Sequence, residues 1–297
     1  MVWNNREHHI LNDFYMKRIL LTAIIAAMFF PGCQNKQVSI NAAPNTKSST
    51  SIVSRPYWIT VQVRDDETFT MLYEFFKDEL QFPVYFHPEK WGHARYTAIY
   101  AGNVMLEICG PFEIPGTELM ARYNSLAFRP FESLQSSADE LTRRRINHNG
   151  PPKPGTYAID LFDLEIPVNI SAVKDPNEVS RREALRAELR VRNGGPIGLK
   201  NVKELYIGYN SKKRLDQWIN LIRPAKHQKN LWYLPEEPNL RFVEGESERI
   251  RAIVLKVESL EKATGYLKRN GMLENQAEKS VEIVKTKTGG LRIILEE

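Results

Sequence analysis

Hydrophobic residues change their spacing twice between residues 57 and 112. Residues 57–63 alternate between β-forming apolar side chains and polar ones, which predicts a half-buried strand. After Asp65 and Asp66, apolar residues recur at helical spacing as far as Leu80, which predicts a helix. Three β-type runs follow, at 84–86, 95–100 and 104–109, with the hairpin signal Gly102-Asn103 before the last run. The stretch therefore predicts a strand, a helix and three strands.

The start of this unit recurs further along the chain. Short β-type runs at 125–129, 204–209 and 252–256 each precede a segment with helical spacing of apolar residues. The second unit is the least regular, with a turn-rich segment before a strand at 157–161. Residues 176–192 then predict a charged helix, whose Arg and Glu residues alternate as on a solvated, salt-bridged surface. We expect this helix to link two halves of the protein and not to bind nucleic acid.

The amino-terminal segment has the proportions of a signal peptide. A basic start at Met16-Lys17-Arg18 precedes the apolar run 19–30, which is too short to span a bilayer. The segment then closes with Gly32-Cys33. The ending resembles a bacterial lipobox and predicts a signal peptide over 1–32 with acylation of Cys33, although Phe30-Pro31 leaves open which signal peptidase acts. The alternative is a buried or fraying apolar helix. Met16 is a better start than Met1, and residues 33–54 form a polar segment that predicts a flexible tether.

Composition and charge restrict the choice of function only slightly. A chain of 297 residues with 42% hydrophobic and 26% charged residues suits two globular domains. The net charge of +5 is spread along the sequence, whereas nucleic-acid binding usually needs a concentrated basic face. If Cys33 carries lipid, Cys109 is the one remaining thiol, and we expect it to be a small buried side chain and not a nucleophile.

Together, these features resemble a known family. Four βαβββ units, an aspartate just after the first strand, and a Gly-Asn turn before a strand with Leu106-Glu107 resemble the vicinal oxygen chelate superfamily of glyoxalases, bleomycin-resistance proteins and extradiol dioxygenases. The resemblance implies an α+β fold in which four βαβββ modules form two glyoxalase-like curled-sheet domains. These domains are expected at 55–175 and 201–297, joined by a linker helix at 176–200. It also implies cupped cavities, which hold a metal ion in many members.

The resemblance supplies one metal-ligand candidate. Glu107 occupies the position of the last-strand ligand, but the first-strand position, usually histidine, holds Trp58. The corresponding places in the other units hold Ser125 or Leu126, Lys203 or Glu204, and Arg251 or Ala252. One carboxylate without imidazole binds a transition metal weakly. A structural role for Glu107, such as an ion pair with Arg95 on the adjacent strand, is an equal alternative.

Aromatic and histidine residues of the first unit form a candidate ligand pocket. About half of the strand aromatics should face the cup, because successive side chains point to opposite faces of a sheet. His87 and His93 flank the loop between the second and third strands and could reach the mouth of the cup, although loop histidines are commonly just solvated. The predicted pocket residues are Trp58, Tyr96, Tyr100, His87 and His93.

Two main hypotheses follow for function. The first is a diverged envelope protein of bacteria, lipid-anchored or periplasmic, that binds a small organic molecule in its cupped sheet without the usual histidine ligands. The second is a metal-dependent lyase, isomerase or dioxygenase that uses Glu107 as a ligand of a divalent metal. A third is a structural protein that uses the 176–192 helix as an interaction surface, with a fully packed cup. Four modules in one chain permit either a monomer or a homodimer.

Overall fold

The computed structural model describes residues 50–114, 119–153, 157–172 and 176–297. The predicted signal peptide, Cys33 and nearly all of the tether lie outside these residues. The described residues belong to one compact unit, so the predicted boundaries near 175 and 200 stay a prediction. No helix in this part of the chain is long and apolar enough to cross a membrane.

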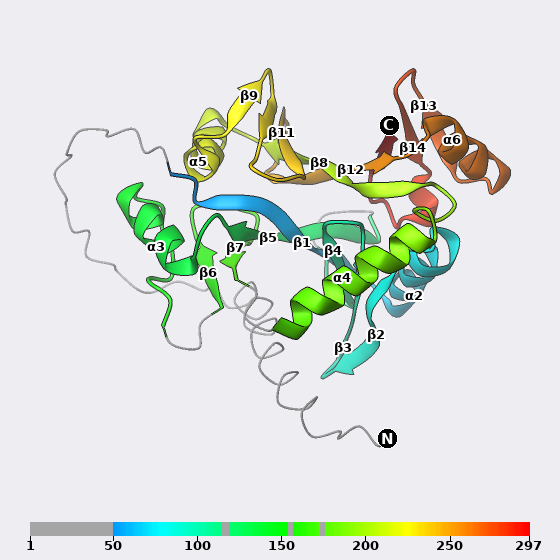
Figure 1. Ribbon diagram of the computed structural model, residues 1–297, viewed down its shortest axis with the longest axis horizontal. Coiled ribbons are helices and arrows are strands. Elements are labelled where there is room, and N and C mark those ends of the chain that lie inside the picture. Colours follow the sequence, from blue (N-terminus) through cyan, green and yellow to red (C-terminus); the bar gives the residue numbers. More distant parts are fainter. Residues whose placement is uncertain (1–49, 115–118, 154–156, 173–175) are drawn as a thin grey trace. The chain divides into compact units, whose positions relative to one another are not determined.

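Two mixed sheets form the framework (Figure 1). The first sheet has the order β2-β3-β4-β1-β5-β7-β6. It comprises β1 (Val53–Val63), β2 (Val84–Trp91), β3 (Ala94–Tyr100), β4 (Met105–Gly110), β5 (Ala121–Pro130), β6 (Ala158–Leu161) and β7 (Val168–Ser171). The second sheet has the order β13-β14-β15-β12-β8-β11-β10-β9. It comprises β8 (Leu199–Tyr209), β9 (Lys226–Gln228), β10 (Leu231–Tyr233), β11 (Asn239–Glu244), β12 (Arg249–Val257), β13 (Leu273–Gln276), β14 (Ser280–Ile283) and β15 (Ile293–Glu296).

Each module begins with a central strand and a helix. The central strands pair antiparallel, β1 with β5 and β8 with β12, and each also pairs parallel with the last strand of its own module. The helices are α2 (Asp66–Glu74), α3 (Leu134–Arg143), α5 (Lys212–Ile222) and α6 (Leu260–Arg269), with α4 (Pro176–Val191) between the two halves. The predicted α+β fold with two curled sheets is confirmed. In the second module, two strands and not three follow the helix among the described residues.

A polar residue after each central strand starts the module helix. Asp65 accepts a hydrogen bond from the backbone nitrogen of Thr68 at 2.7 Å. Ser133, Ser211 and Ser259 accept equivalent bonds from the third residue beyond them. Such caps satisfy backbone donors that have no partner within the helix. This explains why the spacing of hydrophobic residues changes from the strand pattern to the helix pattern at the same place in all four modules.

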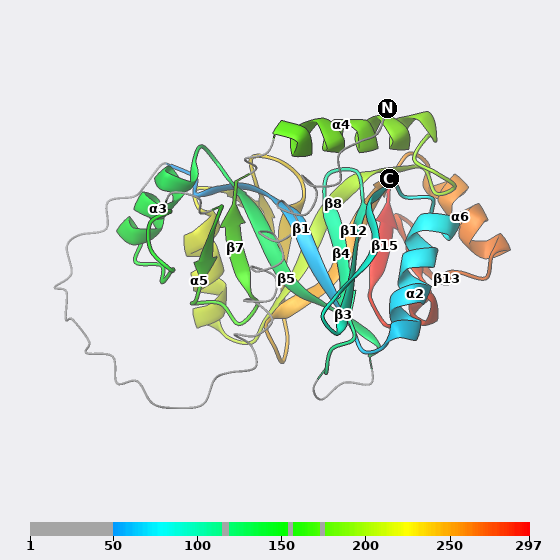
Figure 2. The same cartoon turned by 90° about the horizontal axis from the view of Figure 1, so that it is seen from below.

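One hydrophobic core is shared by the two sheets. Ile59 and Val61 of β1, Leu205 and Ile207 of β8, and the buried faces of the module helices belong to a single cluster. Figure 2 shows α2 and α6 on one side of the sheets and α3 and α5 on the other. Because strand side chains alternate, the opposite face of each sheet is excluded from this core. That second face forms the cup of each sheet.

The predicted hairpin at Gly102-Asn103 joins the two sheets. The Asn103 side chain donates to the carbonyl of Val202 at 3.0 Å and accepts from its nitrogen at 2.8 Å. Gly102 has a φ of 84°, and a Cβ there would lie 2.5 Å from the carbonyl oxygen of Lys200. Glycine is therefore required both for the turn and for this close approach.

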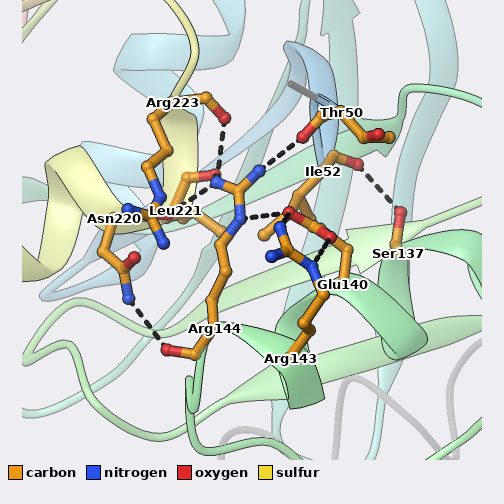
Figure 3. A network of polar contacts seen from close by, with 9 residues as sticks. All are labelled: Thr50, Ile52, Ser137, Glu140, Arg143, Arg144, Asn220, Leu221 and Arg223. Atoms are coloured by element: carbon orange, nitrogen blue, oxygen red, sulfur yellow. Dashed lines mark hydrogen bonds and ion pairs between the residues drawn. The ribbon is translucent and has the colours of Figure 1, made fainter. Parts of the chain in front are cut away.

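A buried arginine connects α3, α5 and the start of the described chain (Figure 3). Arg144, whose side chain is fully buried, forms an ion pair of 2.5 Å with Glu140. It also donates to the carbonyls of Asn220 and Arg223, at 2.7 and 2.8 Å, and to that of Thr50. The α5 carbonyls have no helical partner at that end, so Arg144 satisfies them.

Replacing Arg144 with methionine should destabilise the protein strongly. Arg144→Met removes the donor for these carbonyls and breaks a buried ion pair, so we expect a loss of about 3 to 5 kcal/mol in the free energy of unfolding. The matched control is Arg143→Met, because Arg143 also binds Glu140 but its side chain is 40% exposed. That change should cost less than about 1 kcal/mol. Urea unfolding followed by circular dichroism measures both, and equal losses would contradict the assignment.

Candidate functional site

The face of the first sheet that lies away from the shared core carries most of the candidate residues. In β1 and β4, Ile59 and Leu106 belong to the core, so their neighbours Trp58 and Glu107 point to the other side. We call this face the first cup, defined by Trp58, Thr60, Tyr96, Tyr100, Met105 and Glu107. The structure thus brings Trp58, Tyr96, Tyr100 and Glu107 to one side of the sheet.

Glu107 is a buried carboxyl group in the middle of the first cup. It is 3% exposed, and its Oε2 accepts hydrogen bonds from the Trp58 indole nitrogen at 3.2 Å and the Thr60 hydroxyl at 3.1 Å. Its Oε1 is buried without a hydrogen-bond partner in the described structure. Burial raises the pKa of Glu107, and the two hydrogen bonds oppose that shift. Burial therefore makes ionisation of this carboxyl less favourable than it is in water.

Neighbouring groups share this apolar environment. Burial raises the pKa of Tyr96 to about 12, with smaller contributions from Cys109 and Glu107. Cys109 is buried, and burial raises the pKa of its thiol well above the usual range. A protonated, buried thiol is a poor nucleophile, in keeping with the small buried side chain expected from the sequence.

Helix α4 covers the first cup. Leu185 packs in one cluster with Tyr100 and Met105, against which Trp58 and Tyr85 also lie. These contacts place α4 beside the end of β3 and the start of β4, and α4 also contacts β2 (Figure 1). The sequence predicts a solvated helix here, which is wrong for one face, because Leu185 is only 6% exposed. The spacing of Leu185 and Leu189, one helical turn apart, was the available signal.

Strand register identifies the equivalent positions in all four modules. The parallel pairs are Thr60 with Glu107, Ala127 with Asn169, Tyr206 with Arg241, and Val254 with Ile294. The residues two positions before the first member of each pair are Trp58, Ser125, Glu204 and Ala252. None of these eight ligand positions holds histidine, and each sheet has one carboxylate among its four positions, Glu107 in the first sheet and Glu204 in the second. The described residues contain no group of three His, Cys, Asp or Glu side chains placed to hold a metal ion.

The chemistry of these donors does not fit the metal site that the fold implies. Glu107 is held by an indole and a hydroxyl, and neither Ser125 nor Asn169 is a strong transition-metal ligand. We therefore derive no reaction step through a metal.

We call the equivalent face of the second sheet the second cup. Its ligand-position carboxylate, Glu204, is paired with an arginine of the same face. The buried carboxylate of Glu204 accepts from Arg241 Nε at 2.8 Å, and the guanidinium lies 5.5 Å from the Tyr206 ring centroid. Beside them, Ala252 and Val254 form a small apolar cluster with Ile294. Glu282, opposite Ile294 on the same face, is paired with Arg292 at 3.1 Å. Because these carboxylates already have arginine partners, the first cup is the better candidate site.

The structure places the remaining candidates away from Glu107. His87 is exposed, and its Nδ1 lies 2.8 Å from the hydroxyl of Tyr73 on α2. His93 is exposed in the turn between β2 and β3. The expected ion pair between Glu107 and Arg95 is wrong, because Arg95 stacks on Phe69 and approaches Asp66 at 3.5 Å. Its neighbour Tyr96 faces the cup, and adjacent strand residues cannot share a face.

Helix α4 packs beside the part of the first cup that holds Glu107. A surface hollow of about 340 Å³ at Arg64 and residues 111–114 lies away from the first cup. Leu185 of α4 packs on Tyr100 and Met105, and Met105 is the residue before Glu107 on this face of β4.

The Glu107 carboxyl should make stability depend on pH. The pKa of Glu107 is higher in the folded state than in the unfolded state. Its contribution to the free energy of unfolding is therefore fully present below the unfolded pKa and is lost as the pH rises through the folded pKa. The neutral variant Glu107→Gln should therefore gain stability relative to wild type between pH 5 and pH 8, by about 1.4 kcal/mol for each unit of pKa difference. Urea unfolding at both pH values measures this gain.

Glu204→Gln is the matched control. It removes a buried carboxylate that is paired with arginine, so we expect it to destabilise the protein at both pH values. A constant difference between Glu107→Gln and wild type would contradict the assigned environment of Glu107.

Comparison with known proteins supports the fold. No protein-family model and no curated protein matches the sequence. Homoprotocatechuate 2,3-dioxygenase from Brevibacterium fuscum, with 3,4-dihydroxyphenylacetate bound, has a TM-score of 0.59 at 12% identity, covering 86% of this chain and 83% of its own. The 2,3-dioxygenase LapB from Pseudomonas sp. KL28 has a TM-score of 0.54 at 11% identity, covering 83% and 92%. The Mn(II)-bound glyoxalase from Novosphingobium aromaticivorans has a TM-score of 0.52 at 11% identity, covering 83% and 82%. The chain therefore has the curled-sheet fold of the vicinal oxygen chelate proteins.

Proposed function

We propose that this protein binds a small organic molecule in the first cup, without the metal chemistry of the proteins that share its fold. The observation that carries the proposal is the hydrogen bond from Trp58 to Glu107. An indole occupies the position where the resemblance expects an imidazole ligand, and it donates a hydrogen bond to Oε2 of the carboxyl group expected to bind a metal.

The proposed site has the composition of a small-molecule pocket. Trp58, Tyr96 and Tyr100 supply apolar surface, and Glu107 Oε1 supplies a polar atom without a partner in the described structure. Binding sites commonly combine apolar walls with a few convergent polar groups. A neutral carboxyl can donate to a carbonyl or accept from a hydroxyl of the ligand. Helix α4 would close over the bound molecule and exclude water.

Names of the structural neighbours are compatible with a small ligand. The Brevibacterium dioxygenase was crystallised with 3,4-dihydroxyphenylacetate, and the glyoxalase carries Mn(II). They also keep a second candidate function open, a metal-dependent lyase, isomerase or dioxygenase with Glu107 as a ligand. Metal content separates the two proposals.

The apolar dye N-phenyl-1-naphthylamine should bind the purified protein and accept energy from Trp58. We expect Trp58→Phe to remove the larger part of the sensitised emission, because transfer falls steeply with distance. Direct excitation of the dye measures binding itself and separates it from transfer. Trp232→Phe is the matched control, since Trp232 lies in the second sheet against His227. No binding, or an equal loss in both variants, would sink the proposal.

The same protein should hold no stoichiometric divalent metal after incubation with micromolar Mn²⁺ or Fe²⁺. If metal is bound in a one-to-one ratio and is lost in Glu107→Ala, the enzyme alternative is correct and the proposal of a metal-free binding site is wrong.

We further propose that the protein is anchored to the bacterial cell envelope through acylated Cys33. The basic start, apolar run and Gly32-Cys33 ending support this proposal. Cells expressing the protein should incorporate labelled palmitate into it, and Cys33→Ser should abolish the label. Equal labelling of both proteins would overturn the anchor.

A further inference from the structure

Arginine side chains gather between α4 and the first sheet. Two come from the sheet and three from the helix, and together they surround the aromatic rim of the first cup. They are Arg55, Arg129, Arg181, Arg182 and Arg186. The hydrogen bonds of Glu107 come from Trp58 and Thr60, so the arginine cluster is a separate feature of this face.

Arg182 and Arg129 enclose the buried ring of Tyr57. The two guanidinium carbons lie 4.9 and 4.1 Å from the ring centroid. Glu178 is the shared carboxylate, 2.9 Å from Arg182 Nη2 and 3.7 Å from Arg129 Nη2. The N–H groups of Arg182 Nη2 do not point at the Glu178 oxygen, so this buried nitrogen forms an ion pair without a hydrogen bond. Arg182 also lies 6.0 Å from the Trp58 ring.

Arg55 and Arg186 continue the cluster towards Tyr100. Arg55 Nε pairs with Glu236 at 3.2 Å, and Arg186 Nε lies 3.4 Å from the Tyr100 hydroxyl. Burial lowers the pKa of Arg55, and the positive charges of Arg182 and Arg186 lower it further against Glu236. Beyond the effect of burial, the positive charge of Arg182 therefore lowers the pKa of Arg55 on β1 and of Arg129 on β5.

The positive charge in this region exceeds the negative charge. The side chains of Arg55, Arg129 and Arg182 are only 18, 16 and 11% exposed. Their ion-pair partners are Glu178 and Glu236, so three guanidinium groups share two carboxylates. Arg181 and Arg186 add positive charge at the rim, and Glu183 offsets one of them. Holding like charges together away from water is costly unless a counter-charge is present.

We propose that the first cup takes an organic anion, with its acidic group at Arg182 and Arg55 and its flat apolar part against Trp58 and Tyr100. The proposal rests on the binding function proposed above and specifies its ligand class. Carboxylate, sulfonate and phosphate groups all match the donors of a guanidinium. Helix α4 covers the cup, so the ligand is a small molecule and not a polymer.

Two dyes that differ by one acidic group test this ligand class. 8-Anilino-1-naphthalenesulfonate is N-phenyl-1-naphthylamine with an added sulfonate, so the pair separates charge from apolar contact. Wild-type protein should bind the sulfonate at least about tenfold more tightly than the neutral dye, since a charge-assisted hydrogen bond contributes about 1.5 to 3 kcal/mol. Fluorescence titration of the purified full chain measures both dissociation constants.

Variants at the cluster locate the effect. Arg182→Gln should weaken binding of the sulfonate about tenfold or more and leave the neutral dye unchanged. Arg190→Gln is the matched control, because it removes the same charge from the exposed face of α4, and both dyes should bind it as they bind wild type. If Arg182→Gln does not fold, Arg55→Gln serves the same purpose.

The possible outcomes separate the two proposals. If the neutral dye binds but the sulfonate gains nothing, or if Arg182→Gln and Arg190→Gln behave alike, the anion proposal is wrong and the binding function stands. If Arg182→Gln weakens both dyes equally, the arginine acts through the structure and the anion proposal is again wrong. If neither dye binds, the proposed function itself fails.

Discussion

Alternation of side chains along β1 and β4 is the constraint on which the rest of this structure depends. Ile59, Val61 and Leu106 face the core that the two sheets share, whereas Trp58 and Glu107 face the cup. A change on the core face disturbs the packing of both sheets at once. A change on the cup face leaves that packing in place. The fold can therefore persist at 12% identity to a dioxygenase while the ligand positions take different residues.

The contents of the two cups differ because their charges are balanced differently. In the second cup Glu204 is paired with Arg241 on the neighbouring strand, and its charge is cancelled locally. In the first cup burial raises the pKa of Glu107, and its hydrogen bonds come from Trp58 and Thr60. The arginines come from α4 and, at the rim, from Arg55 and Arg129. The carboxyl group of the first cup is thus bonded to an indole and a hydroxyl, whereas that of the second cup is bonded to a guanidinium.

The sequence predicted the fold well because its signals are local. Asp65 ends the strand period and caps the helix, and the turn at Gly102-Asn103 needs glycine for its φ. The position of α4 could not be predicted in the same way, because arginines that stack on aromatic rings and arginines in water look alike in sequence. The error at Arg95 was avoidable, since its neighbour Tyr96 was already expected in the cup. The partners of Asn103 across 99 positions of sequence were beyond any local pattern.

The two ends of α4 are held by different interactions, and this difference determines how the first cup could open. Near the carboxyl end, Leu189 belongs to the shared core, and a Cβ on Gly195 just beyond the helix would lie 2.6 Å from the Leu80 carbonyl. Towards the amino end the contacts are polar: Arg181 and Arg182 stack on Tyr85 and Tyr57, and Glu178 pairs with Arg129 of β5. A movement of the amino end would break these polar contacts around Arg182 and Trp58, whereas a movement of the carboxyl end would expose apolar core residues. An anion bound at Arg182 would add an interaction to the amino-terminal half of the helix, so that ligand binding and closure of the cup are coupled.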